Sequence, residues 1–146
     1  MSYETKANPA KKDKVAKLEE TVGKANGIIF TDFTGLTVAE INNLRTRFFE
    51  SGNAEYIVAK NTLARLALTK KGYEAKMDQI DESLQGPTGM AIGFDDPMLP
   101  LKLIAGFAKE TNDKPKFKGG VVDGEYYNVE QLQQLKEHQK NLLHIL

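Results

Sequence analysis

The sequence of 146 residues contains no cysteine and only two histidines. Without cysteine the chain has no disulfide framework, no thiolate zinc site and no cysteine nucleophile, which suits a reducing cytoplasm. The histidines, His138 and His144, lie six residues apart, so they occupy different faces of a helix and lack the i, i+4 spacing of a zinc pair. We expect no bound metal.

Membrane and catalytic signatures are also missing. No apolar run approaches the roughly 20 residues of a membrane span, and the first residues lack the apolar core of a secretion signal. Asp95 and Asp96 precede Pro97, so at least one is explained as a helix cap rather than part of a catalytic pair. We predict no membrane contact, cofactor, small-molecule substrate or enzymatic activity. A small α/β enzyme for a phosphorylated metabolite is the alternative from another class.

Positive charge is concentrated locally, although the formal net charge of the chain is +0. The segments 1–17, 60–76 and 102–118 have balances of +3, +4 and +3, whereas the segment 77–96 has five acidic residues and no basic one. Three basic segments that converge on one face would form the electrostatic footprint of a phosphate-binding surface. Solvated lysine faces are common, so charge alone leaves both interpretations open.

Apolar periodicity and end signals predict alternating helices and strands. Thr37 and Glu40 form a capping box, Asn128 with Gln131 three residues later starts the last helix, and Asp123-Gly124 is a hairpin turn signature. Asn8 before Pro9 caps the first helix. Helices are expected over 9–24, 37–52, 61–71, 97–111 and 128–146, and strands over 28–33, 56–59, 89–94, 119–122 and 125–127. These elements predict an α/β domain over 1–127, with a small mixed β-sheet and a basic N-terminal helix, and a C-terminal helical extension over 128–146.

The segment Lys60-Asn61-Thr62 follows a predicted strand and begins a predicted helix. An ammonium group, an amide, a hydroxyl and the unpaired N–H groups of a helix start would then point in the same direction. Such donors suit the phosphates and sugars of a nucleic acid. An ordinary helix cap formed by Asn61 or Thr62 is the alternative explanation.

Five segments together resemble the family of large ribosomal subunit protein ten, the bacterial stalk base protein. The resemblance covers roughly residues 10–135, and the K-N-T-L element in this setting is quite specific. The segments are F-T-G-L-T (33–37), A-E-I-N-N-L-R (39–45), V-A-K-N-T-L (58–63), L-Q-G-P-T-G-M-A-I-G-F (84–94) and K-G-G-V-V-D-G (118–124).

This resemblance implies an α+β plait that binds a folded junction of large-subunit ribosomal RNA beside ribosomal protein eleven. It also implies a cytoplasmic, non-enzymatic component of the ribosome. The residues expected to bind RNA are Lys11, Lys12, Lys14, Thr34, Gly35, Lys60, Asn61, Thr62 and Arg65. Arg45 also matches a position of the family. Two roles stay open for it, which are contact with RNA and anchoring of its helix.

In the family, a C-terminal helix carries dimers of the acidic stalk protein, which recruit translational GTPase factors. The stalk-dimer site expected here is the apolar stripe of Leu132, Leu135, Leu142 and Leu143. From Asn128 to the last residue a helix would span about 27 Å, which is room for one dimer rather than several. A ribosome assembly factor with the same fold and the same RNA site is the alternative function.

Overall fold

The computed structural model describes residues 9–145, with side chains over residues 15–137. The cap expected from Asn8 lies outside the described residues. The helices are α2 (Pro9–Gly23), α3 (Val38–Glu50), α4 (Asn61–Leu68), α5 (Met77–Ser83), α6 (Leu99–Glu110) and α7 (Val129–Ile145). The strands are β1 (Gly27–Asp32), β2 (Ala54–Val58), β3 (Gly89–Gly93), β4 (Lys116–Val122) and β5 (Glu125–Tyr127). The α/β fold class is confirmed.

The strands form a single sheet in the order β2-β3-β1-β4-β5, and each neighbouring pair is antiparallel. A mixed sheet was expected, because the helix between β1 and β2 suggests that these strands run in parallel. They do run in the same direction, but β3 lies between them and opposes both. The unit β1-α3-β2 is therefore a split β-α-β arrangement, in which β3 lies between the two parallel strands.

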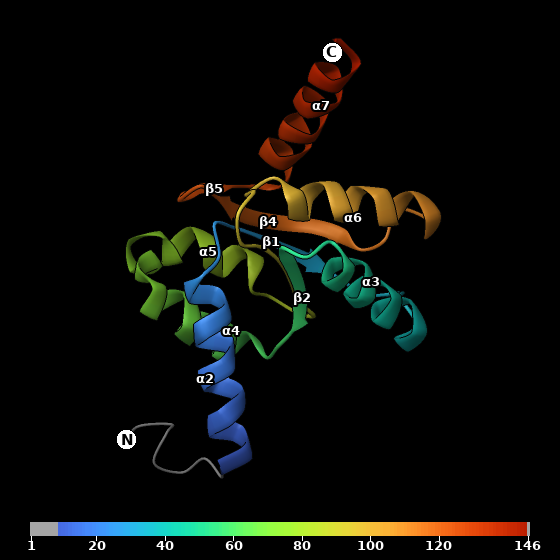
Figure 1. Cartoon of the computed structure of the whole chain (residues 1–146). Coiled ribbons are helices and arrows are strands. Elements are labelled where there is room, and N and C mark those ends of the chain that lie inside the picture. The colour runs from blue at the N-terminus through green and yellow to red at the C-terminus, as the bar shows by residue number, and fades with distance from the viewer. Residues whose placement is uncertain (1–8, 146) are drawn as a thin grey trace.

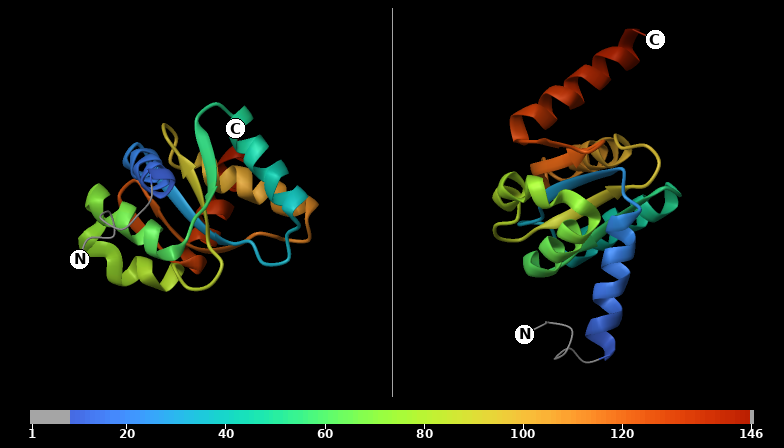
Figure 2. Two further views of the ribbon diagram at one scale, coloured as in Figure 1. Left: turned by 90° about the horizontal axis from the view of Figure 1, so that it is seen from below. Right: turned by 90° about the vertical axis from the view of Figure 1, so that its left-hand side faces the viewer.

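Helices cover both faces of this sheet (Figure 1). Alternate residues of β1 point to opposite faces, so Ile28 and Phe30 join one core cluster and Ile29 joins the other. The first cluster is closed by α2, α4 and α5, and the second by α3, α6 and the start of α7. Figure 2 shows α2 and α7 extending from the body in opposite directions.

Local end signals determine the starts of α3 and α7. Thr37 Oγ1 accepts a hydrogen bond from the Glu40 N–H at 3.0 Å, and the Glu40 carboxylate accepts one from the Thr37 N–H at 2.9 Å. Asn128 and Gln131 make the same reciprocal pair at the start of α7. Both caps confirm the sequence prediction. None of the described helices is long and apolar enough to span a membrane.

Three details differ from the sequence prediction. Lys60, not Asn61 or Thr62, is the capping position of α4, and its side chain makes no capping hydrogen bond. After α4 the chain continues through a π-helical turn (Thr69–Tyr73) and a 3₁₀ turn (Glu74–Lys76) into α5, a helix that was not expected. Leu68 in α4 and Ile80 in α5 are fully buried, so packing holds the helices on either side of this irregular segment.

The leucines of α7 fall into two groups. Leu132 is fully buried in the second core cluster, and Leu135 packs partly buried against it. Leu132 is therefore a core residue of the domain in this structure, and its expected contact with stalk dimers stays a prediction. The side chains of Leu142 and Leu143 lie outside the described part of the chain.

Candidate nucleic-acid interface

Four connections meet at one end of the sheet. Val58 and Thr31 both pair with Gly89, and Asp32 pairs with Lys116. β1 and β2 therefore end where β3 and β4 begin. We use the name loop end for the four segments that connect to these strand termini, which are residues 33–37, 59–62, 84–88 and 111–115. The predicted RNA-binding residues Thr34, Gly35, Lys60, Asn61 and Thr62 are brought together there.

The loop after β1 is held by a carboxylate. Asp32 Oδ1 accepts a hydrogen bond from the Thr34 N–H at 2.9 Å, and hydrogen bonding from Thr34 lowers the pKa of the Asp32 carboxyl. Gly35 has a φ of 91°, and a β-carbon there would overlap the Lys114 side chain. Lys114 thus lies directly over the Gly35 backbone. The loop exposes Thr34 and Gly35 to solvent.

In the K-N-T segment, Lys60-Asn61-Thr62, one side chain makes a contact within the protein and the other two are exposed. The Asn61 amide donates a hydrogen bond to the Gly86 carbonyl at 2.9 Å, which joins the start of α4 to the loop before β3. Lys60 and Thr62 are exposed. The expected group of donors is present at a helix start, but the Asn61 amide is already used within the protein.

Lys118 organises the loop before β3, a role that the sequence did not reveal. The pairing of β1 with β4 shifts register between Phe30 and Thr31, so Lys118 is the extra residue of a bulge. Its ammonium group donates to the carbonyls of Gln85 and Pro87 and to the Thr88 hydroxyl. Burial lowers the pKa of Lys118.

A shallow depression of about 410 Å³ lies at the loop end. Its polar lining comes from the K-N-T segment and the loop before β3, and its apolar lining comes from the ends of β1 and β2. It has no cluster of titratable groups for catalysis, and the described residues contain no group of three metal ligands. The lining residues are Phe33, Val58, Ala59, Lys60, Asn61, Gly86, Pro87 and Thr88.

Several other basic side chains are occupied by internal contacts. Arg65 Nε lies 2.8 Å from Asp81 Oδ1, and this ion pair joins α4 to α5. Lys70 pairs with Glu19, and Lys71 donates to the Gly23 carbonyl at the end of α2. Much of the positive charge of the segment 60–76 therefore joins this segment to α2 and α5. We assign Arg65 primarily to this structural role.

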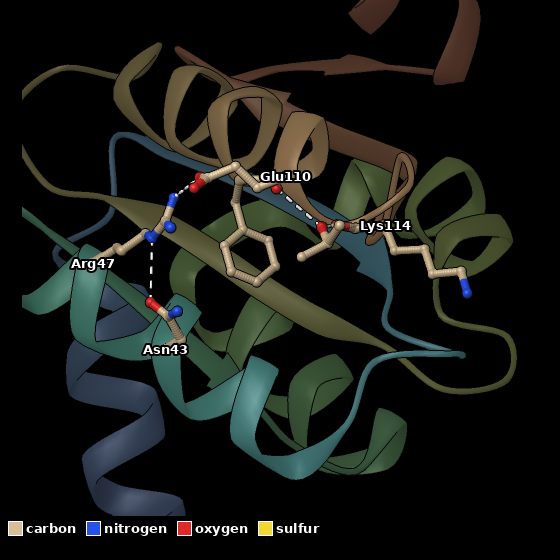
Figure 3. Close-up of polar contacts among 6 residues, drawn as sticks. Asn43, Arg47, Glu110 and Lys114 are labelled. Carbon is tan, nitrogen blue, oxygen red and sulfur yellow. Dashed lines mark hydrogen bonds and ion pairs between the residues drawn. The ribbon is translucent and has the colours of Figure 1, made fainter.

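Arg47 clamps α3 to α6 on the second face of the sheet (Figure 3). Its guanidinium pairs with Glu110, donates a hydrogen bond to the Asn43 side-chain oxygen at 3.2 Å, and lies 5.1 Å from the centre of the Phe107 ring. Hydrogen bonding from Arg47 lowers the pKa of Glu110. Lys114 points away from this clamp in Figure 3, toward the β1 loop.

Three of the predicted RNA-binding lysines lie in the N-terminal helix α2. Lys11, Lys12 and Lys14 belong to the first turns of α2, but their side chains lie outside the described residues. The first described lysine is Lys17, which is exposed.

Comparison with known proteins identifies the family of this chain. Residues 6–109 match the family model described as ribosomal protein L10. The chain belongs to the ribosomal protein L10 family. The predicted resemblance is confirmed, and the matched region includes α2 to α6 with the K-N-T segment.

Individual L10 relatives support the same conclusion. The large ribosomal subunit protein uL10 of Clostridium tetani is 40% identical over 131 residues, which are 90% of this chain and 73% of the relative. The protein of that name from Prosthecochloris aestuarii is 43% identical over 121 residues, which are 83% of this chain and 67% of the relative. The L10 family consists of structural proteins of the ribosome and not of enzymes, as predicted. This chain is a component of the large ribosomal subunit.

Proposed function

We propose that this chain binds large-subunit ribosomal RNA through its loop end. The observation that carries the proposal is the convergence of four connections that expose Thr34, Gly35, Lys60 and Thr62 on one surface. Lys60 has no ion-pair or hydrogen-bond partner among the described side chains, and it precedes the unpaired N–H groups of α4. Cations and helix-start N–H groups hold phosphates and fix the orientation of a nucleic acid.

The positions of the aromatic side chains indicate which kind of RNA the loop end binds. Phe30, Phe48 and Phe107 are fully or almost fully buried in the two core clusters, and the exposed Phe49 lies near the end of α3, away from the loop end. Phe33 is the aromatic residue that lines the depression, and it is half-buried, so the surface offers little room to stack a run of unpaired bases. Recognition then depends on the shape of a folded RNA and on its backbone. A folded ribosomal RNA junction, bound beside ribosomal protein eleven, meets this description. Lys11, Lys12 and Lys14, in the first turns of α2, are proposed as further RNA contacts on the basis of the sequence.

Replacing Lys60 with alanine should weaken binding to the ribosomal RNA junction fragment. Because one phosphate contact is lost, the slope of log K against log salt should fall by about one. Filter binding or fluorescence anisotropy between low and moderate salt measures both quantities. Lys102→Ala is the matched control, because Lys102 is exposed in the first turn of α6, which follows the opposite end of the sheet. Equal slopes for Lys60→Ala and the wild type would remove Lys60 from the contact surface.

We also propose that α7 anchors a dimer of the acidic stalk protein, which recruits translational GTPase factors. The helix is held to the body by the buried Leu132 and then extends away from it (Figure 1). Leu135, Leu142 and Leu143 carry this proposal, because apolar residues at helical spacing form the anchors of a helix bound in a groove.

Native mass spectrometry of the chain with acidic stalk protein and the RNA fragment tests the two proposals together. We expect a complex that contains both partners, and loss of the stalk dimer alone in a Leu142→Asp/Leu143→Asp variant. RNA binding without any stalk dimer would favour the assembly-factor alternative. Binding of neither partner would contradict both functions.

A further inference from the structure

A second hollow lies beside the loop end, between α2, α3 and the outer edge of β2. It has a volume of about 510 Å³. We call it the edge groove. Its apolar floor comes from β2, α2 and α4, and three long cations from different elements stand at its rim. The lining residues are Lys17, Leu18, Thr21, Arg45, Glu55, Ile57, Val58, Ala59, Lys60 and Leu63.

The cations of the edge groove have no partner within the described part of the chain. Lys17, Arg45 and Lys60 are exposed, and no ion pair or side-chain hydrogen bond joins them to another described residue. Carboxylates do lie close to Lys17 in sequence, but Glu20 pairs with Lys24 and Glu19 pairs with Lys70, each at 3.0 Å. The groove therefore retains positive charge, while nearby lysines are neutralised.

The floor of the groove supplies unpaired backbone groups. β2 is the edge strand of the sheet, and β3 is its neighbour on the inner side. The outer side of an edge strand presents a row of N–H donors and C=O acceptors. N–H groups hold phosphate oxygens, and carbonyls accept hydrogen bonds from ribose hydroxyls.

The edge groove is continuous with the loop end. Val58, Ala59 and Lys60 line both hollows, so the surface runs without interruption from the start of α4 along β2 to α2. We propose that this track binds the sugar–phosphate backbone of an RNA strand, with Lys17 and Arg45 as phosphate contacts beyond the loop end. The proposal extends the RNA-binding function proposed above and depends on it.

Glu55 makes the proposal more specific. It is half-buried in the groove without a described partner, and its negative charge repels a phosphate strand. Removing this charge should strengthen RNA binding, whereas removing Lys17 or Arg45 should weaken it. A role for these residues in folding alone would not produce opposite changes in affinity.

The experiment measures binding of the full chain to the ribosomal RNA junction fragment over a series of salt concentrations. In the double variant Lys17→Gln/Arg45→Gln, affinity at low salt should fall about tenfold or more, and the salt slope should fall by about 1.5. Glu55→Gln should raise affinity about two- to threefold. Lys102→Gln is the control outside the groove, and thermal unfolding establishes that each variant is folded.

The outcomes separate this inference from the function on which it rests. If the wild-type chain fails to bind the RNA, the proposed function fails and the groove loses its ligand. If the wild type binds and Lys60→Ala weakens binding, but the groove variants behave like Lys102→Gln, the inference alone is overturned. An acidic peptide added to the β2 edge is the competing occupant. Polyglutamate is the probe for that occupant. The inference would also be overturned if polyglutamate binding depended on Lys17 and Arg45 while RNA binding did not depend on them.

Discussion

Replacing Gly89 with alanine should lower the free energy of unfolding by about 2–5 kcal/mol. Gly89 lies in β3, where a β-carbon would overlap the Tyr56 hydroxyl and crowd Thr31 Oγ1. Tyr56 is 1% exposed and its ring packs 5.7 Å from that of Phe48, so it has no room to turn away. The substitution adds overpacking and disrupts the buried 2.8 Å hydrogen bond between Tyr56 and Thr31. Urea unfolding followed by circular dichroism measures the change.

Gly106→Ala is the matched control, with the opposite sign expected. Gly106 lies within α6, and an added β-carbon there would meet nothing within 4 Å. Alanine in a helix interior is favoured over glycine by about 0.5–1 kcal/mol. The control should therefore be slightly more stable than the wild type. Equal stability of the Gly89→Ala and Gly106→Ala variants would contradict the packing described around Tyr56.

Leu132→Ala should lower the free energy of unfolding by a similar amount, about 2–5 kcal/mol. Leu132 is 0% exposed and packs in the second core cluster, so its truncation leaves a cavity between α7 and the sheet. Chemical unfolding measures the loss, and hydrogen exchange of the α7 amides tests whether the helix start detaches.

Val129→Ala provides the comparison on the same helix. Val129 is 40% exposed, and a change at such a site should alter stability by no more than about 0.5 kcal/mol. If Leu132 were instead an open contact for the stalk dimer, Leu132→Ala would reduce dimer binding and leave unfolding unchanged. This experiment therefore distinguishes a core residue from an interface residue.

Most features that depend on three or four neighbouring residues were predicted correctly, and the cap of α4 is the exception. The capping box of Thr37 and Glu40, the cap at Asn128 and the turn at Asp123-Gly124 depend on neighbouring residues alone. The order of strands was not predictable in this way. The position of β3 between β1 and β2 depends on burial of residues that are distant in sequence, and no local pattern records it.

The residue types of the site were predictable from the sequence, but the contacts among their side chains were not. The segment 60–76 was recognised as basic, yet charge counting could not reveal that Arg65 pairs with Asp81 on an unexpected helix. The seven residues of α5 are rich in acids and contain few apolar side chains, so their periodicity is weak. Lys17 and Arg45 were also not assigned, because only the fold places them beside the edge of β2. Long-range contacts decided which cations are available.

The strand order also constrains how the chain folds while it is being synthesised. β1 pairs with β3 and β4, and β2 pairs with β3, so neither early strand has a neighbour before Gly93 has been made. At translation rates of about 5–20 residues per second, β1 waits roughly 3–12 s for its first partner. During that interval Ile28, Ile29 and Phe30 can be covered only by helices or by a chaperone. We expect the helices to form first and the sheet to assemble late, in a single cooperative step.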